Sequence, residues 1–223
     1  MTTLFIARRG AWLARQTQAQ LESSREYRVL GAADSLYRAR DALSRLDPDA
    51  LLIDLRLEDG AALSLVHGLR ERHAERPKVM LIAADASDAL LFRTLRAGAD
   101  AYLLEADLGV AASMLGRMMV GEATMAAPIA VQALHFFNEP MPAAGQAAAA
   151  NDRGLDWQTH ATHPMRLSPG EHRLLQSVAL GLRSGEVAAR MAISGEALGR
   201  RIGNVYRKLS WDLRSGSLAL LAA

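Results

Sequence analysis

A set of hydrogen-bonding side chains gathers near the C-terminal end of the chain, in the segment 195–209: Arg200, Arg201, Asn204, Arg207 and Lys208. If this segment is a helix, residues 200, 204 and 207 share one face. In the DNA major groove Arg pairs with guanine and Asn with adenine, whereas charges nearer a helix end more often touch phosphate. The segment therefore predicts a DNA-reading helix, and two residues before it are further candidate DNA contacts: Arg183 and Ser194.

Apolar residues in the same segment follow the spacing of one helical stripe: Leu198, Ile202, Val205 and Leu209. This stripe predicts a helix that packs by one face and shows its basic residues on the other. Gly199 and Gly203 depart from the pattern, because a glycine inside a helix costs about 1 kcal/mol relative to alanine. They either let the backbone approach DNA closely or leave the helix weak until bound. A solvated basic face with no nucleic-acid partner is the alternative interpretation.

The distribution of charge also favours a polyanionic partner for the C-terminal part of the chain. The whole chain carries +2 at pH 7, but residues 166–223 contain nine Lys and Arg against four Asp and Glu. This part therefore carries +5 and the remainder −3. A basic segment behind an acidic body is typical of proteins that bind nucleic acid.

Catalytic, metal and membrane signals are lacking in the sequence. There is no cysteine, and the six histidines show no metal-helix spacing such as HExxH. No Gly-rich phosphate loop or nucleophile elbow is present. No run of about 18 apolar residues and no signal peptide is found. We therefore expect no enzymatic activity, no cofactor, no metal and no membrane contact, in a cytoplasmic protein.

The first half of the chain alternates short apolar runs with helical stretches. The apolar runs are Leu4–Ala7, Tyr27–Leu30, Ala50–Asp54, Val79–Ala83 and Ala101–Leu104. The helical stretches are Trp12–Leu21, Leu36–Leu46, Leu63–Arg70, Ala89–Leu95 and Val110–Val120. This alternation predicts an α/β fold with a doubly wound, five-stranded parallel sheet. The functional crevice of such a sheet lies at the carboxyl ends of its strands.

The composition predicts four parts: a domain over 1–122, an additional helix over 123–137, a linker over 138–165 and an all-α domain of four helices over 166–223. The linker is rich in Ala, Pro and Gly and poor in large apolar residues. Ser168, Pro169 and Glu171 form a capping-box pattern at the start of the first of the four helices. Ser194 caps the third helix, and Ser215 starts a last one ending at Leu221.

The C-terminal sequence LSPGEHRLLQSVALGLRSGEVAARMAISGEALGRRIGNVYRKL resembles the LuxR-type helix-turn-helix of NarL/FixJ-like response regulators. Leu167-Ser168-Pro169, Gly181 and Ile193-Ser194 carry the likeness at the right mutual spacings. The resemblance implies a helix-turn-helix whose third helix enters the DNA major groove. It also implies a homodimer on paired half-sites, and the candidate contacts are the apolar residues of Val110–Val120 and of the last helix, Leu218, Leu220 and Leu221.

The segments DALLIDLRLEDG and RAGADAYLLEAD resemble the third-strand and fifth-strand regions of response-regulator receiver domains, which have a flavodoxin-like fold. The resemblance implies that Asp54 is the phosphoacceptor position and that Tyr102 is the aromatic switch position. Receivers also have an acid pair that holds Mg²⁺, a Thr or Ser, and a Lys. Here Arg8 and Arg9 stand at the positions of the acid pair. Ala83 stands at the position of the Thr or Ser, and Glu105 at the position of the Lys.

These replacements predict a receiver pocket that does not accept a phosphoryl group. Mg²⁺ prefers hard oxygen ligands, and two guanidinium groups at its place would repel it. Arg forks onto carboxylates, so Arg8 or Arg9 is expected to hold Asp54 in an ion pair and to depress the pKa of that carboxyl. The alternative is that both Arg side chains point to solvent. An ordinary core or surface role for Tyr102 is an equally good interpretation, since Ala83 occupies the position of the Thr to which the switch residue responds.

Together these features predict a DNA-binding transcriptional regulator, an atypical response regulator controlled independently of aspartyl phosphorylation. Double-stranded DNA, a second copy of the chain and RNA polymerase are the expected partners. The alternative is a receiver-type protein-interaction adaptor with weak or vestigial DNA binding. The target promoter, the signal and the direction of regulation do not follow from the sequence.

Overall fold

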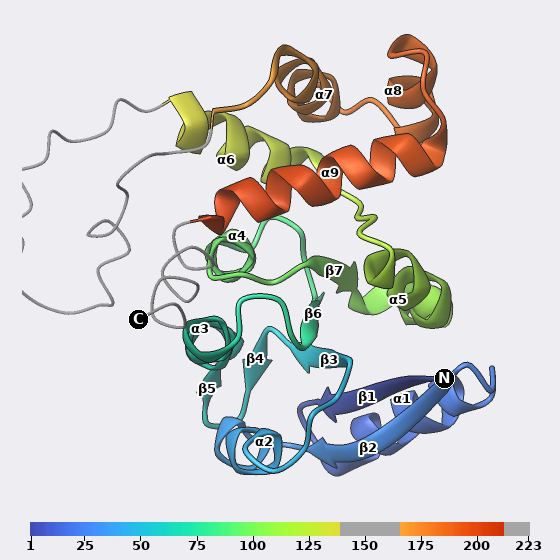
Figure 1. The fold of residues 1–223 in the computed structure, drawn as a ribbon, viewed down its shortest axis with the longest axis vertical. Helices are drawn as coiled ribbons and strands as arrows, with labels where there is room; N and C mark the ends of the chain where they lie inside the picture. The colour runs from blue at the N-terminus through green and yellow to red at the C-terminus, as the bar shows by residue number, and fades with distance from the viewer. Residues whose placement is uncertain (139–165, 212–223) are drawn as a thin grey trace, which may run out of the picture.

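A computed structural model describes residues 1–138 and 166–211 of the chain. Its larger sheet has five parallel strands in the order β2-β1-β3-β6-β7 (Figure 1). The strands are β1 (Thr2–Ala7), β2 (Tyr27–Ala33), β3 (Ala50–Asp54), β6 (Lys78–Ala83) and β7 (Ala101–Leu104). This confirms the predicted doubly wound sheet, and the strand order is that of flavodoxin-like folds.

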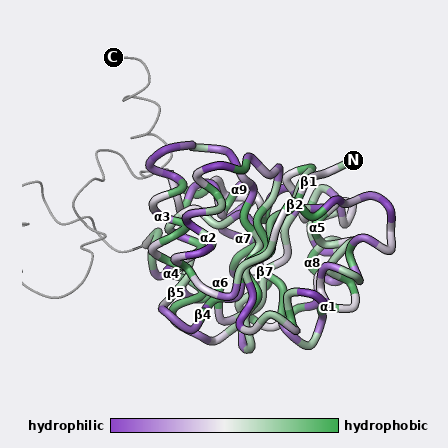
Figure 2. The backbone as a smooth tube through the Cα atoms, turned by 90° about the horizontal axis from the view of Figure 1, so that it is seen from below, coloured by the Kyte–Doolittle hydropathy of each residue, from purple (hydrophilic) through white to green (hydrophobic). Residues whose placement is uncertain are grey.

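Five helices cover the two faces of this sheet. Helices α2 (Leu36–Leu43), α3 (Ala62–Arg72) and α4 (Ala89–Arg96) lie along one face, and α1 (Ala11–Glu22) and α5 (Ala111–Met119) lie along the other (Figure 1). A 3₁₀ helix, η1 (Glu105–Val110), precedes α5. The residues of the inner strands are among the most hydrophobic of the chain (Figure 2). Leu51, Leu52 and Ile53 of β3 are fully buried, as expected for a strand covered on both faces.

The strand register brings the carboxyl ends of β1, β3, β6 and β7 to one edge of the sheet. Ala7 pairs with Ile53, Asp54 with Ile82, and Ala83 with Leu104. The residues that follow β1 and β7, Arg8 and Glu105, therefore start from the same edge as Asp54. A two-stranded hairpin of β4 (Arg56–Leu57) and β5 (Gly60–Ala61), which the sequence analysis did not predict, follows β3.

Four helices make up the rest of the described chain. They are α6 (Ala127–Asn138), α7 (Pro169–Ala179), α8 (Ser184–Arg190) and α9 (Gly195–Leu209). The predicted linker and the predicted last helix, Ser215–Leu221, lie outside the described residues. In the ranges 1–138 and 166–211, no helix has the length and apolar character needed to cross a membrane.

Local hydrogen bonds explain where α7 and α9 begin. The Glu171 backbone N–H donates to Ser168 Oγ at 3.2 Å, and the Ser168 N–H donates to Glu171 Oε2 at 2.7 Å. This confirms the predicted capping box, with Pro169 in the first turn. Ser194 Oγ accepts the Ala197 N–H at 3.1 Å and caps α9.

Replacing the cap of α7, Ser168→Ala, should lower the free energy of unfolding by about 1 kcal/mol, because it leaves an N–H donor of the first turn without its partner. Urea denaturation followed by circular dichroism measures this. Ser184→Ala is the matched control, since Ser184 is the first residue of α8 and lies after its cap. Equal effects of the two substitutions would contradict the assigned cap.

Candidate functional site: a degenerate phosphoacceptor pocket and a DNA-reading helix

A single buried guanidinium occupies the carboxyl edge of the sheet. Arg8 is only 2% exposed, and its Nε donates to Asp54 Oδ1 at 3.0 Å. Its Nη2 donates to Glu105 Oε1 at 3.1 Å, and its Nη1 donates to Thr17 Oγ1 at 3.1 Å. Arg8 therefore links the ends of β1, β3 and β7 to helix α1.

Arg9 meets Asp54 through its backbone rather than its side chain. The Arg9 N–H donates to Asp54 Oδ2 at 2.7 Å, so both oxygens of Asp54 accept a hydrogen bond from the residues after β1. The Arg9 side chain is exposed. The predicted ion pair with Asp54 is thus present and belongs to Arg8. The alternative, that both Arg side chains face solvent, is wrong for Arg8.

Burial raises the pKa of Asp54 above its ordinary value, and the contacts with Arg9 and Arg8 only partly oppose this. The expected lowering of this pKa is therefore wrong, because loss of hydration outweighs the ion pair in a residue that is only 8% exposed. Because the pKa of Asp54 is higher in the folded state than in the unfolded state, the folded state binds more protons at pH values between these two pKa values. The contribution of Asp54 to stability is then greatest in acid and falls as pH rises through that interval.

Tyr102 on β7 points out of this pocket, toward the chain that precedes α6. Its side chain is buried, and its Oη accepts the Ala126 N–H at 2.9 Å. Burial raises the pKa of this phenol. Ala83, at the end of β6, is also buried and offers no hydroxyl to the pocket. Tyr102 is therefore a buried residue that holds the segment Gly121–Ala126, called here the strap.

Helix α9 lies against this strap. The Ala123 N–H of the strap donates to Gly199 O at 3.0 Å, and the Tyr206 hydroxyl of α9 donates to Thr124 O at 2.7 Å. Glu122 is 7% exposed and lies between Arg117 Nε at 3.1 Å and Arg200 Nη1 at 3.5 Å. Three polar contacts thus join α9 to the segment that follows α5.

The two glycines of α9 make this close approach possible. A Cβ added to Gly203 would lie 2.2 Å from Gly121 O, and one added to Gly199 would lie 3.1 Å from Glu122 Cβ. Real Cβ atoms do not approach a backbone oxygen to 2.2 Å, so only glycine fits at position 203. The two explanations offered from the sequence, approach to DNA or a weak helix, did not include this one: in the described arrangement the glycines face the strap.

The predicted DNA-reading residues of α9 are divided between different surroundings. Asn204 and Arg207 contact each other, and Arg200 reaches Glu122 and also Glu196 at 3.8 Å. Lys208 is held by Glu171 Oε2 of α7 at 2.6 Å. Among the other candidates, Arg201 lines a groove beside α7, Arg183 is exposed before α8, and Ser194 caps α9. The contacts thus bring Asn204 and Arg207 together, place Arg200 beside the strap, and place Arg201 and Lys208 beside α7.

In the described arrangement α9 is covered on two sides. Its stripe of Leu198, Ile202, Val205 and Leu209 is buried, and the strap covers the flank that carries Gly199, Gly203 and Tyr206. A helix with its side chains is about 10–12 Å across, and the DNA major groove is about 12 Å wide. In this arrangement the strap lies where one wall of a major groove would lie if α9 entered it.

Comparison with known proteins identifies the N-terminal part. Residues 11–105 match the family model "Response regulator receiver domain". This part of the chain is a response regulator receiver domain. The nitrate/nitrite response regulator homologue of Haemophilus influenzae is 25% identical over 175 residues, which cover 78% of this chain and 73% of that protein.

Two further proteins are similar over nearly the whole chain. The transcriptional regulatory protein YdfI of Bacillus subtilis is 21% identical over 200 residues, covering 90% of this chain and 85% of that protein. The structure of the two-component response regulator RcsB in complex with DNA is 16% identical, covers 98% of both chains and has a TM-score of 0.53. At this identity the structural match supports the shared fold, a receiver followed by a helical domain.

The receiver pocket does not fit the Mg²⁺ ion that the receiver family uses. Two carboxylates are present, but the Arg8 guanidinium lies between Asp54 and Glu105 and bonds to both. A divalent cation would have to displace this buried positive charge and has no acid pair after β1 to replace it. In the described part of the chain, no group of three or more His, Cys, Asp or Glu residues is placed to hold a metal.

Arg8→Ala should destabilise the receiver by about 3–5 kcal/mol, because it leaves the buried Asp54 carboxylate without its cation. The double variant Arg8→Ala with Asp54→Asn should lose less stability than Arg8→Ala alone. A double-mutant cycle measured by urea denaturation should give a coupling of about 0.5–3 kcal/mol. Arg9→Ala is the control, since its exposed side chain can change without removing the backbone contact. Additive effects would refute the coupling.

Gly203→Ala should separate α9 from the strap, because the added Cβ would lie 2.2 Å from Gly121 O. Amide hydrogen exchange of residues 121–126 should then speed up, although alanine is the better helix former by about 1 kcal/mol. Gly68→Ala, in α3, is the control because an added Cβ there meets nothing within 4 Å. If the strap amides exchange at the same rate in both variants, the close contact at Gly203 is not what holds α9.

Proposed function

We propose that the chain is a DNA-binding transcriptional regulator whose receiver is controlled independently of aspartyl phosphorylation. The observation that carries the proposal is α9: a helix held by one apolar stripe, with Arg200, Asn204 and Arg207 on the opposite side. Arg and Asn are residues that read base edges in the major groove. The whole-chain likeness to RcsB, which has been solved bound to DNA, supports the same interpretation.

The charge inside the pocket supports control without phosphorylation. Phosphoryl transfer requires neutralisation of the charge that spreads over the phosphoryl oxygens, and receivers supply it with a metal. In this pocket the one buried cation already bonds to Asp54 and Glu105, and the second oxygen of Asp54 accepts the Arg9 N–H. Each oxygen of Asp54 therefore already accepts a hydrogen bond from the residues after β1, and these residues include no acid pair that would bring a metal ion to Asp54.

The contact between α9 and the strap supports a resting state that excludes DNA. The strap is tied to the receiver by Tyr102 and to α9 by Tyr206. DNA binding then requires α9 to leave the strap, and any partner or change in concentration that favours the separated form raises DNA binding. A second copy of the chain and RNA polymerase are the partners we propose. The exposed side chains of Val110 and Val120 offer apolar contacts for the former.

A receiver-type adaptor with weak DNA binding is the second candidate. It is favoured by one specific observation: two positions on α9 carry glycine, and both meet the strap. In this candidate α9 serves mainly to hold the two parts of the chain together. Its distinguishing property is the absence of a preferred DNA site even when α9 is released.

Arg200→Ala should weaken binding to the preferred site in the chain's own upstream region by about 1–3 kcal/mol, because a bidentate base contact is lost. A gel-shift titration measures this, and the control is Arg28→Ala, since Arg28 is an exposed residue of β2. Acetyl phosphate with Mg²⁺ should change neither the gel shift nor the mass of the protein. Unchanged affinity in Arg200→Ala would refute the reading role of α9, and a phosphorylated Asp54 would refute control without phosphorylation.

A further inference from the structure

A groove of about 910 Å³ lies where α6, α7, α8 and α9 meet. These helices lie together at one end of the molecule (Figure 1). Three arginines line the groove: Arg173 from α7, Arg190 from the end of α8 and Arg201 from α9. The groove is not used by the phosphoacceptor pocket, and of the candidate DNA-reading residues it contains only Arg201.

The positive charge of this groove is not balanced by the acids nearby. No Asp or Glu lines it. In the described C-terminal helices, Glu171 is bound to Lys208, Glu186 accepts the Arg183 N–H, and Glu196 lies near Arg200. Within the described residues, none of the three groove arginines has an acidic partner. Like charges gathered in a concave surface raise its potential and attract anions.

The rest of the lining is apolar. Leu180, which is 78% exposed, and the partly buried Met191 and Leu134 provide hydrophobic surface beside the guanidinium groups. Guanidinium groups pair with carboxylate or phosphate oxygens through two parallel hydrogen bonds. A volume of about 300–1,000 Å³ with apolar walls and a few polar groups is usual for sites that take small organic molecules.

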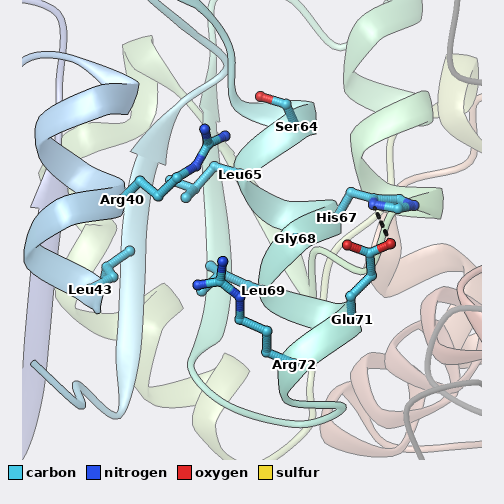
Figure 3. A pocket seen from close by; sticks show the side chains of 9 residues that line it. All are labelled: Arg40, Leu43, Ser64, Leu65, His67, Gly68, Leu69, Glu71 and Arg72. Atoms are coloured by element: carbon cyan, nitrogen blue, oxygen red, sulfur yellow. Dashed lines mark ion pairs between the residues drawn. The ribbon is translucent and has the colours of Figure 1, made fainter. Parts of the chain in front are cut away.

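A second hollow, between α2 and α3, shows what distinguishes this groove. It measures about 300 Å³, and Arg40 and Arg72 line it (Figure 3). Glu71 also lines it and lies 3.6 Å from His67 Nδ1, so this hollow contains a carboxylate of its own. It is smaller and partly neutralised, and it serves as a matched comparison.

We propose that the groove between α6 and α9 binds a small amphipathic organic anion, with a carboxylate or phosphate group on Arg173, Arg190 and Arg201 and an apolar body on Leu134, Leu180 and Met191. Because α6 follows the strap and the other three helices belong to the C-terminal region, one ligand contacts both. Binding therefore favours the arrangement in which α9 lies on the strap. Only this last effect, on DNA access, rests on the proposed function.

Isothermal titration calorimetry on the full chain tests the site with two probes of the same shape, 2-naphthoate and the uncharged 2-naphthylmethanol. Naphthoate should bind one-to-one, at least about tenfold more tightly than the alcohol, since a charge-assisted hydrogen bond contributes more than 1.4 kcal/mol. Arg190→Gln with Arg201→Gln should weaken naphthoate binding at least about tenfold. Arg40→Gln with Arg72→Gln, in the other hollow, should leave it unchanged. Circular dichroism checks that both variants fold.

Three results would overturn the proposal: equal binding of the acid and the alcohol, unchanged naphthoate binding in the groove variant, or no saturable binding of naphthoate. Greater loss in the variant of the α2–α3 hollow would place the anion there instead. No DNA is present in this experiment, so a chain that fails to bind DNA would refute the proposed function and leave this result standing. A naphthoate-induced loss of the gel shift would then test the coupling separately.

Discussion

A buried positive charge must be paired and hydrogen-bonded to offset the loss of its hydration, and the carboxyl edge of the receiver sheet is arranged around one such charge. Arg8 leaves β1 at the edge where β3 and β7 also end, and there it bonds to Asp54 and Glu105. The parallel register brings these groups together, because the carboxyl ends of neighbouring parallel strands lie at the same edge of the sheet. The same edge that carries phosphoryl chemistry in receivers is here closed by its own side chains.

A short series of contacts connects the pocket with helix α9. Tyr102 is on β7, shortly before Glu105, and it contacts the strap through Ala126. The strap in turn contacts α9, since Thr124 bonds to Tyr206 and Ala123 to Gly199. No contact in this series requires a phosphoryl group. The receiver and α9 are therefore joined through one backbone segment, the strap, which contacts both.

Much of the fold could be predicted from local patterns, because those patterns have local causes. Short apolar runs between helical stretches indicated the parallel sheet, and Ser168 with Glu171 indicated the start of α7. The contact of Arg8 with Asp54 could be predicted only with the receiver resemblance. The role of Gly203, the direction of the Asp54 pKa and the pairing of Lys208 with Glu171 could not be predicted. The first and the last depend on a neighbour far away in the chain, and the pKa depends on how completely the fold buries Asp54.

The salt bridge of Arg8 with Asp54 also differs from a phosphoryl group in its lifetime. A phosphoryl group on an aspartate is added and removed while the protein persists, so it can report an event that has just passed. Both partners of this ion pair are encoded in the gene and are present from the moment the chain folds. An ion pair encoded in this way is a constant feature of the folded chain, whereas a phosphoryl group is a mark added after synthesis.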